Sequence, residues 1–231
     1  MRRLGILTGL ASELRLILKT AAITPPPIYA CAGSDPVRAR REAGRLIAEG
    51  AEALISFGLA GGLISRLRPG HIVLAEKTIL PGGRAIEMDK EWAGRLLRLS
   101  SGSGLAIEAG AIAGSDRIIP TPDEKHALAA QTGALIVDMQ THALAEAAEA
   151  ARVPALAIRA VSDPADQAVS RIARVAVRPD GEVKTMKVLG MLCAAPWELP
   201  ALLNLRRGQA AAFAALDRLI GLAGPALFGG D

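Results

Sequence analysis

Aromatic residues are scarce in this chain and make up 3% of its 231 residues. With so few rings, we expect Ala, Leu, Ile and Val to build the core, and few side chains can stack on nucleic-acid bases. The formal net charge of +4 is not gathered into a dense Lys/Arg stripe. These features argue against nucleic acid as a partner, whereas a mildly basic chain suits an anionic substrate or an anionic membrane surface.

Cysteine and histidine are also scarce. Cys31 and Cys193 lie far apart in the sequence, and two thiols in a chain of this size do not make a disulfide framework. His71, His126 and His142 lack the short spacing that is typical of a metal site. We therefore expect two reduced thiols, a cytoplasmic location and no bound metal.

Long uninterrupted hydrophobic runs are missing as well. The N-terminal stretch MRRLGILTGLA begins like a signal peptide, but Glu13 and Arg15 follow at once, so we predict a first β-strand there. Asp217, Arg218 and Pro225 interrupt the apolar C-terminal region. No segment approaches the ~20 uncharged apolar residues that a membrane-spanning helix needs.

Hydrophobic residues make up 51% of the chain and charged residues 22%, which is enough apolar material for a sizeable core. The length suits a single domain over residues 1–231. Apolar strand-like runs alternate with helix-like segments, a pattern that favours a parallel sheet covered on both faces. The predicted strands are Leu4–Thr8, Ile28–Ala32, Ala53–Phe57, His71–Thr78, Leu105–Ala113, Leu135–Val137 and Pro154–Val161.

Polar caps followed by proline mark two helix starts. Asp35-Pro36 opens a predicted helix that ends near Gly50, and Thr121-Pro122 opens another. Together the elements predict an α/β fold of three layers, α/β/α, with a mainly parallel, twisted and mixed central sheet. The other predicted helices are residues 12–19 with Ser12 as the cap, Thr141–Ala151, Val183–Cys193, Glu198–Arg206 and Gln209–Leu222.

Small and polar residues follow four of the predicted strands. Glu13 comes soon after the first strand and Gly58–Gly62 after the third, while Asp138 and Asp163 follow two later strands. Because ligands bind beyond the carboxyl ends of parallel strands, we predict that these residues line one cleft. Taken singly, each has an ordinary explanation as a tight glycine turn, an acid at a helix start, or a turn before proline. The glycine-rich segment matches neither a P-loop nor a dinucleotide fingerprint.

Several segments match a known family in their order and spacing. They are GILTGLASEL, ISFGLAGGL with PGHIVLAE, GSDRIIPTPDEK and VDMQTHALAEAAEAARVPALAIRAVSDPAD, and they span residues 3–166. The chain resembles the nucleoside phosphorylase superfamily, in particular its methylthioadenosine/S-adenosylhomocysteine nucleosidase branch, which implies a phosphorylase-like fold. The order of the segments and the C-terminal helices look most similar to the hopanoid-associated phosphorylases, bacterial proteins placed in the conversion of adenosylhopane to ribosylhopane.

The resemblance implies two catalytic acids. Asp163 matches the acid that protonates the purine at N7, and Glu13 matches the acid that activates water in the nucleosidases. The chemistry suits these residue types, because cleavage of an N-glycosidic bond leaves negative charge on the departing base. A buried carboxyl that keeps its proton can neutralise that charge.

The resemblance also implies a binding site for ribose and base. Met139 and Gln140 match the ribose-binding pair, and the segment around Ile118 matches the one that covers the base. The glycine-rich segment matches the loop near the ribose and the nucleophile. The implied substrate-binding residues are Asp138, Met139, Gln140, Ile118, Ile119, Gly58, Leu59, Gly61 and Ser162.

Two positions depart from the family pattern. Gln140 stands where the family usually has Glu, and an amide offers one acceptor oxygen and a donor where a carboxylate offers two acceptors. Leu59 stands where a small hydroxyl residue is common, which removes a hydrogen bond to phosphate. Gln140 therefore predicts weaker ribose binding or a different substrate. Leu59 favours hydrolysis over phosphorolysis, with inorganic phosphate kept as an alternative co-substrate.

We therefore predict an enzyme without a resident cofactor that cleaves the N-glycosidic bond of a purine nucleoside and releases adenine, with adenosylhopane as the expected substrate. A large, lipid-linked substrate suits an apolar groove lined by Leu199–Leu205 and Gln209–Phe228, whereas the ordinary alternative is that these segments pack on the sheet. The resemblance suggests a homodimer, and a lipid-linked substrate allows peripheral membrane contact.

Three alternatives to this prediction stay open. The first is a general methylthioadenosine/S-adenosylhomocysteine nucleosidase. The second is a nucleoside-binding protein that has lost turnover through Gln140. The third is a peripheral scaffold for membrane lipid synthesis.

Overall fold

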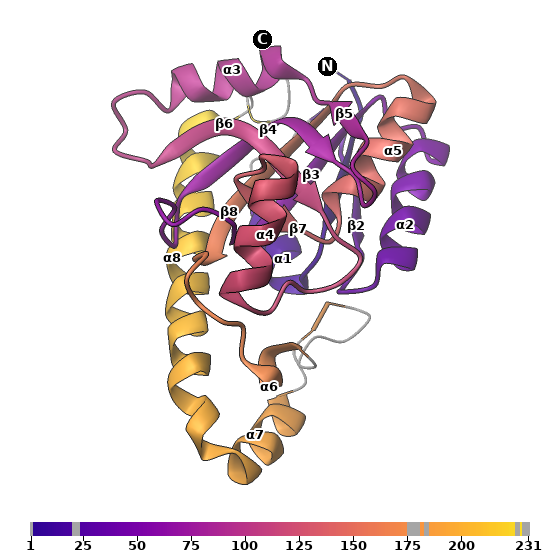
Figure 1. Cartoon of the computed structure of the whole chain (residues 1–231). Helices are drawn as coiled ribbons and strands as arrows, with labels where there is room; N and C mark the ends of the chain where they lie inside the picture. The colour runs from indigo at the N-terminus through magenta and orange to yellow at the C-terminus, as the bar shows by residue number, and fades with distance from the viewer. Residues whose placement is uncertain (1, 20–23, 175–180, 183–184, 225–226, 228–231) are drawn as a thin grey trace.

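The computed structural model describes residues 2–19, 24–174, 181–182, 185–224 and 227, which form an eight-stranded mixed sheet with helices on both faces (Figure 1). The strands are β1 (Leu4–Thr8), β2 (Ile28–Cys31), β3 (Ala53–Gly62), β4 (Ile72–Ile79), β5 (Ala85–Glu87), β6 (Ile107–Gly114), β7 (Ile136–Asp138) and β8 (Ala155–Asp163). The helices are α1 (Ala11–Ile17), α2 (Pro36–Ala48), α3 (Lys90–Leu99), α4 (Pro122–Thr132), α5 (Thr141–Ala151), α6 (Arg171–Arg174), α7 (Thr185–Ala194), the 3₁₀ helix η1 (Pro196–Glu198) and α8 (Leu199–Ala223).

Parallel pairing dominates the sheet. β1 pairs in parallel with β2 and β3, β3 with β8, β4 with β6, and β6 with β7. The antiparallel pairs are β3–β7, β4–β5 and β4–β8. The predicted α/β fold with a mainly parallel mixed sheet is confirmed. In addition, β3, β8, β4, β6 and β7 close into a ring that the sequence pattern does not reveal. That residues 1–231 are one domain stays a prediction.

Two hydrophobic clusters cover the two faces of the sheet. Helices α2 and α5 pack on one face through residues such as Ala39 and Leu144. Helices α1, α3 and α8 pack on the other face, where Trp92 and Leu216 are buried. All nine residues of β8 are buried, because this strand lies between the two helical layers. Burial on both faces explains why the strand is an almost continuous apolar run in the sequence.

Two predicted helix starts are confirmed in detail. The Asp35 side chain accepts hydrogen bonds from the backbone N–H groups of Val37 and Arg38, with Pro36 at the first helical position of α2. The Thr121 hydroxyl accepts a hydrogen bond from the N–H of Glu124 at the start of α4. Each cap satisfies backbone donors that have no partner within the helix.

The helix after β1 begins earlier than predicted. Its N-cap is Leu10 and Ser12 lies inside α1, so the prediction that Ser12 caps this helix is wrong. The Glu13 carboxylate takes this role, because it accepts a hydrogen bond of 2.8 Å from the Leu10 N–H. A side chain turned back onto the helix start thus replaces the expected cap.

The predicted glycine-rich turn after the third strand is also wrong. Residues 58–62 continue β3, which pairs with β8 so that Gly58 lies opposite Arg159 and Gly61 opposite Asp163. Glycine has a low strand propensity, but pairing with a neighbouring strand outweighs that preference. The long β3 brings the glycines alongside the end of β8.

Other elements differ from the prediction between residues 80 and 104 and at the C-terminal end. β5 and α3 are not predicted, although Asp89 caps α3 by accepting a hydrogen bond from the Trp92 N–H. The two predicted helices Glu198–Arg206 and Gln209–Leu222 form the single helix α8. Helix α7 confirms most of the helix predicted from Val183, a residue that lies outside the described ones.

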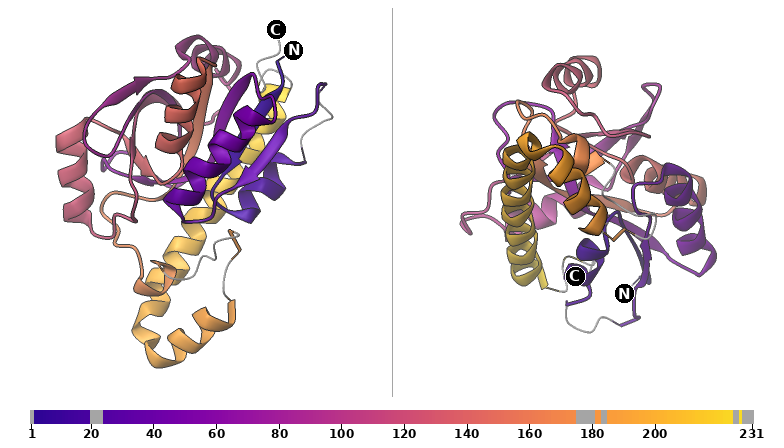
Figure 2. Two further views of the ribbon diagram at one scale, coloured as in Figure 1. Left: turned by 90° about the vertical axis from the view of Figure 1, so that its right-hand side faces the viewer. Right: turned by 90° about the horizontal axis from the view of Figure 1, so that it is seen from below.

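Helix α7 and the first half of α8 extend away from the sheet, whereas the second half of α8 packs against it (Figure 2). Gly208 marks the point where α8 meets β8, and it is buried. A Cβ atom at this position would overlap the carbonyl oxygen of Ser162. Within the described residues, no helix is both long and apolar enough to cross a membrane.

We predict that Gly208→Ala destabilises the protein and that Gly221→Ala, in the same helix, does not. The added methyl group at position 208 forces α8 away from β8, which costs about 1–3 kcal/mol as overpacking does elsewhere. Gly221 has nothing within 4 Å of an added Cβ, so alanine there raises stability by about 0.5–1 kcal/mol through helix propensity. Urea unfolding of both variants measures the difference. Equal stability of the two variants would contradict the close packing of α8 on β8.

Candidate active site

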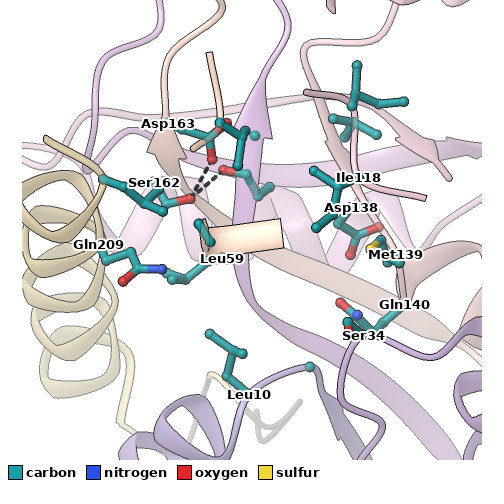
Figure 3. Close-up of a pocket in the computed structure, with 18 of the residues that line it drawn as sticks. Leu10, Ser34, Leu59, Ile118, Asp138, Met139, Gln140, Ser162, Asp163 and Gln209 are labelled. Carbon is teal, nitrogen blue, oxygen red and sulfur yellow. Dashed lines mark hydrogen bonds between the residues drawn. The ribbon is translucent and has the colours of Figure 1, made fainter. Parts of the chain in front are cut away.

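A cavity of about 200 Å³ lies at the carboxyl ends of β1, β3, β7 and β8. Figure 3 shows Ser162 and Asp163 on one side of it and Asp138, Met139 and Gln140 on another, with Gln209 of α8 pointing in. The ends of parallel strands are where ligands bind in α/β sheets, so the sequence pattern located this cleft correctly. The predicted site residues that line the cavity are Glu13, Leu59, Gly61, Ile118, Ile119, Asp138, Met139, Gln140, Ser162 and Asp163.

Asp163 is the last residue of β8 and is 8% exposed. Its Oδ1 accepts a hydrogen bond of 2.8 Å from the Ser162 hydroxyl, and its Oδ2 accepts one of 2.6 Å from Lys125 Nζ. Burial raises the pKa of the Asp163 carboxyl, because desolvation outweighs the lowering effects of Lys125 and Ser162. The predicted acid is therefore buried, aimed at the cavity and inclined to hold its proton.

Lys125 is a member of the site that the sequence does not reveal. Lys125 is 0% exposed and reaches Asp163 from α4. In the sequence it belongs to the charged segment TPDEK, which begins at the N-cap Thr121. Its Nζ also donates hydrogen bonds of 2.9 Å to the carbonyl oxygens of Pro164 and Gln167. A lysine in such a helix start is normally solvated, and only the packing of α4 against the end of β8 shows otherwise.

Glu13 lies in the first turn of α1 and is 2% exposed. Its Oε2 accepts hydrogen bonds of 2.8 Å from the N–H groups of Gly9 and Leu10, and its Oε1 accepts one of 2.8 Å from the Leu59 N–H. Burial raises the pKa of Glu13, although the charge of Arg159 and these backbone donors lower it in part. The ordinary explanation as a helix-start acid holds, and the same carboxyl group also lines the cavity.

Gly58 has a different place from the one predicted. It is not among the described residues that line the cavity; it faces Glu13 instead. A Cβ atom at position 58 would collide with the Glu13 carboxyl group, and the backbone there has φ of 151°. Gly58 thus supports the site by leaving room for Glu13, whereas Leu59 and Gly61 contribute to the wall.

Asp138 is joined to a buried arginine, Arg159, which is not among the predicted site residues. Arg159 is 0% exposed, forms an ion pair with Asp138, and donates further hydrogen bonds to the Ser56 hydroxyl and the Leu59 carbonyl. Asp138 also accepts hydrogen bonds from the backbone and hydroxyl of Thr141. A charged residue inside the apolar strand β8 was the available signal, since charges are rarely buried without a partner.

Gln140 is buried beside the cavity, and its amide has a partner within the protein. Its Nε2 donates a hydrogen bond of 3.1 Å to the Gly33 carbonyl oxygen, while Gly9 packs closely against the amide group. The side chain therefore keeps Oε1 as its acceptor atom. A carboxylate could not donate to Gly33, which gives the departure from the family's Glu a structural reason.

Ile118 and Ile119 lie in the segment between β6 and α4 that forms one wall of the cavity. The Ser115 hydroxyl donates a hydrogen bond of 2.7 Å to the Arg117 carbonyl, which shapes this segment. Its far end is tied to the chain after β8, because the Val169 N–H donates to the Pro120 carbonyl at 2.9 Å. The segment is thus held in place where it lines the cavity, and its role in covering the base stays a prediction.

The charges around the cavity are compensated. Among the described residues that line it, the cations are Arg117 and Lys125, which form ion pairs with Glu124 and Asp163 respectively. Across the described part of the chain, no group of three His, Cys, Asp or Glu side chains is arranged to hold a metal ion. What the cavity offers chemically is a pair of buried acids with raised pKa values, Glu13 in the first turn of α1 and Asp163 at the end of β8.

The comparisons with known proteins agree with this architecture. The family model of the Phosphorylase superfamily matches residues 18–191. The fold is similar to a variant of the Helicobacter pylori 5′-methylthioadenosine/S-adenosylhomocysteine nucleosidase with 5′-methylthioadenosine in its active site, with a TM-score of 0.69 and 16% identity over 96% of this chain and 99% of that one.

Two further solved structures have the same fold. A variant of Helicobacter pylori futalosine hydrolase gives a TM-score of 0.68 at 15% identity, covering 96% of this chain and 99% of that one. The Streptococcus pneumoniae nucleosidase with a transition-state inhibitor gives 0.64 at 19% identity, covering 93% and 99%. No curated protein sequence matches the chain significantly.

We predict that Gln140→Glu destabilises the protein in a pH-dependent way. The ionised carboxylate would face the Gly33 carbonyl, so the variant loses about 1–3 kcal/mol at pH 8. The pKa of the new carboxyl is raised on folding, because only the protonated form can donate to Gly33. Its stabilising contribution is therefore complete below the unfolded pKa of ~4.3 and is lost as the pH rises through the folded pKa.

Urea unfolding at acidic and alkaline pH measures this effect relative to the wild type. Gln131→Glu, the same substitution at an exposed position on α4, serves as the control and should change stability little at either pH. If Gln140→Glu were as stable as the wild type at pH 8, the hydrogen bond to Gly33 would not matter for the fold.

Proposed function

Because the chain belongs to the phosphorylase superfamily, we propose that it cleaves the N-glycosidic bond of a purine nucleoside and releases adenine. The observation that carries this proposal is Asp163, a buried carboxyl with a raised pKa whose side chain faces the cavity. Asp138, Met139 and Gln140 lie on another side of the same cavity, where a ribose would bind while its base meets Asp163.

Asp163 is the proposed general acid. As the bond between N9 and C1′ breaks, the electron pair of this bond moves into the base, and the proton of the Asp163 carboxyl passes to N7 of the base. Burial favours the protonated form before this step. The carboxylate that forms afterwards is stabilised by the hydrogen bonds from Lys125 and Ser162. Hydrogen bonds that become stronger as negative charge develops on Asp163 lower the barrier to departure of the base.

The proposed ribose contacts come from the other side of the cavity. Gln140 presents Oε1 to a ribose hydroxyl, because its Nε2 is held by the Gly33 carbonyl. Met139 lies beside it and offers an apolar surface to the sugar. The ion pair of Asp138 with Arg159 fixes the end of β7 on which both residues depend. A sugar that is already held in one orientation loses less entropy when it reaches the transition state.

Water is the nucleophile that the site favours. The raised pKa of Glu13 makes its carboxylate a stronger base than an exposed one, which suits the deprotonation of water. Phosphate would need several cationic or hydroxyl partners, yet the lining cations Arg117 and Lys125 already pair with acids and the Ser162 hydroxyl donates to Asp163, which leaves the hydroxyl of Ser34. Leu59 also offers only its backbone here, and its N–H is bound to Glu13. These observations support hydrolysis over phosphorolysis.

The lining of the cavity favours a nucleoside substrate with an apolar group at the ribose 5′ position. Apolar side chains make up much of its lining, including Leu10, Leu59 and Val169, together with Ala173 of α6 and Leu205 of α8. Helix α8 thus contributes Leu205 and Gln209 to the cavity and also packs on the sheet. With the resemblance to the hopanoid-associated phosphorylases, this lining favours adenosylhopane as the substrate and ribosylhopane as the product.

A general methylthioadenosine/S-adenosylhomocysteine nucleosidase is the second candidate, because the same apolar lining accepts a smaller 5′-alkylthio group. A homodimer, a cytoplasmic location and contact with a membrane surface stay predictions that accompany the proposed substrate.

Incubation of the purified protein with adenosine, 5′-methylthioadenosine, S-adenosylhomocysteine and adenosylhopane, with and without phosphate, tests the proposal. We expect free adenine from adenosylhopane without phosphate. Faster release from 5′-methylthioadenosine would favour the second candidate, and dependence on phosphate would establish phosphorolysis. A protein that binds these nucleosides but releases no adenine from any of them would be a binding protein and not an enzyme.

We predict that Asp163→Asn lowers the rate of adenine release by about 10²–10⁴-fold, because an amide cannot supply the proton. Asp166→Asn is the matched control, since Asp166 lies three residues away, is exposed, and pairs with His126 and Ser65. Its rate should stay close to that of the wild type. Initial rates at saturating substrate measure both variants, and an Asp163→Asn variant of full activity would refute the assignment.

A further inference from the structure

Lys125 uses all three of its ammonium protons within the protein. Its Nζ donates to Asp163 Oδ2 at 2.6 Å and to the carbonyl oxygens of Pro164 and Gln167 at 2.9 Å each. The side chain is fully buried. An ammonium with three acceptors has no proton left for a substrate, so any effect of Lys125 on the reaction must act through Asp163 and the chain that follows it.

The three acceptors of Lys125 all lie on one segment. Asp163 ends β8, and Pro164 and Gln167 belong to the loop that leads away from it. Lys125 itself lies in the second turn of α4, just after the segment that holds Ile118 and Ile119. The same loop is tied to that segment by the hydrogen bond from the Val169 N–H to the Pro120 carbonyl. One ammonium group therefore connects the general acid to the wall proposed to cover the base.

We propose that Lys125 is a positioning residue for protonation of the base: it holds Oδ2 of Asp163 in a fixed place and stabilises the carboxylate that remains once the proton has left. This inference rests on the proposed function of Asp163. The proton that moves is that of the Asp163 carboxyl, which becomes the N7–H of the base. Lys125 keeps its three protons throughout, so the step balances without a second proton transfer.

The surroundings of Asp163 contain few other polar groups. From α4 it faces Lys125, and from its own strand the Ser162 hydroxyl. The side facing β3 and β7 carries Gly61 and Val137, which have no ionisable atoms. His126 and Asp166 form an exposed pair with each other at 3.2 Å. Lys125 is thus the charged group that influences the pKa of Asp163, and it lowers this pKa against the raising effect of burial.

Loss of the Lys125 charge should therefore raise the pKa of Asp163 further and make it a weaker acid. In Lys125→Met we expect the alkaline limb of the kcat profile to move up by about one pH unit or more, as an opposite charge at this distance implies. We expect kcat at neutral pH to fall about tenfold or more, with KM changed much less, because the lost interaction acts on the charge that develops in the transition state.

Two further variants separate charge from shape. Lys125→Gln removes the charge but keeps hydrogen-bond donors, and should show the same alkaline shift as Lys125→Met. Lys125→Arg keeps the charge and should restore the wild-type pH profile even where its larger planar head group lowers kcat. Lys90→Met, which breaks the exposed ion pair of Lys90 with Glu87 on α3, is the control and should leave the profile unchanged.

A second readout does not depend on turnover. Carbon-13 NMR of aspartate-labelled protein, assigned with Asp163→Asn, follows the titration of the Asp163 carboxyl directly. A midpoint that rises in Lys125→Gln and returns in Lys125→Arg supports the inference. An unchanged midpoint and pH profile in the uncharged variants, with only lower stability, would overturn it. If the wild type releases no base, the proposed function fails, whatever the Lys125 variants show.

Discussion

The parallel pairing of β3 with β8 is the constraint on which the site depends. It runs along most of both strands and places Gly58 opposite Arg159 and Gly61 opposite Asp163. The absence of side chains at these glycines is what allows acids to approach: Gly58 leaves room for the Glu13 carboxyl, and Gly61 has Asp163 Oδ2 beside it. A larger residue at either glycine would displace the acid that the proposed chemistry uses.

Each buried charge near the cavity has a dedicated partner. Asp163 has Lys125, Asp138 has Arg159, and Glu13 has three backbone N–H groups. Such compensation is needed because an unpaired charge in the interior costs several kcal/mol. The compensation is uneven, however, since desolvation still raises the pKa of Asp163 and Glu13. These two acids with a raised pKa are the ones to which we assign the acid and base roles.

The sequence revealed the strand ends and the acids on or just after them, because buried parallel strands are apolar runs and their carboxyl ends gather at one edge. It could not reveal the ring of strands, since antiparallel pairing of β8 with β4 is a tertiary choice without a local signal. Lys125 was missed for a similar reason, as its burial depends on where α4 packs. The predicted break between the helices Glu198–Arg206 and Gln209–Leu222 was wrong, because Gly208 packs closely on β8 inside the continuous helix α8.

Transfer of a proton from Asp163 to N7 of the purine is the central claim, and a substrate change tests it without altering the protein. The measurement compares base release from a nucleoside that the wild type cleaves with release from its 7-deaza analogue, in which carbon replaces N7. The account predicts that the analogue competes for the cavity but keeps its base, because the proton has no acceptor. Cleavage of both nucleosides at similar rates would contradict it.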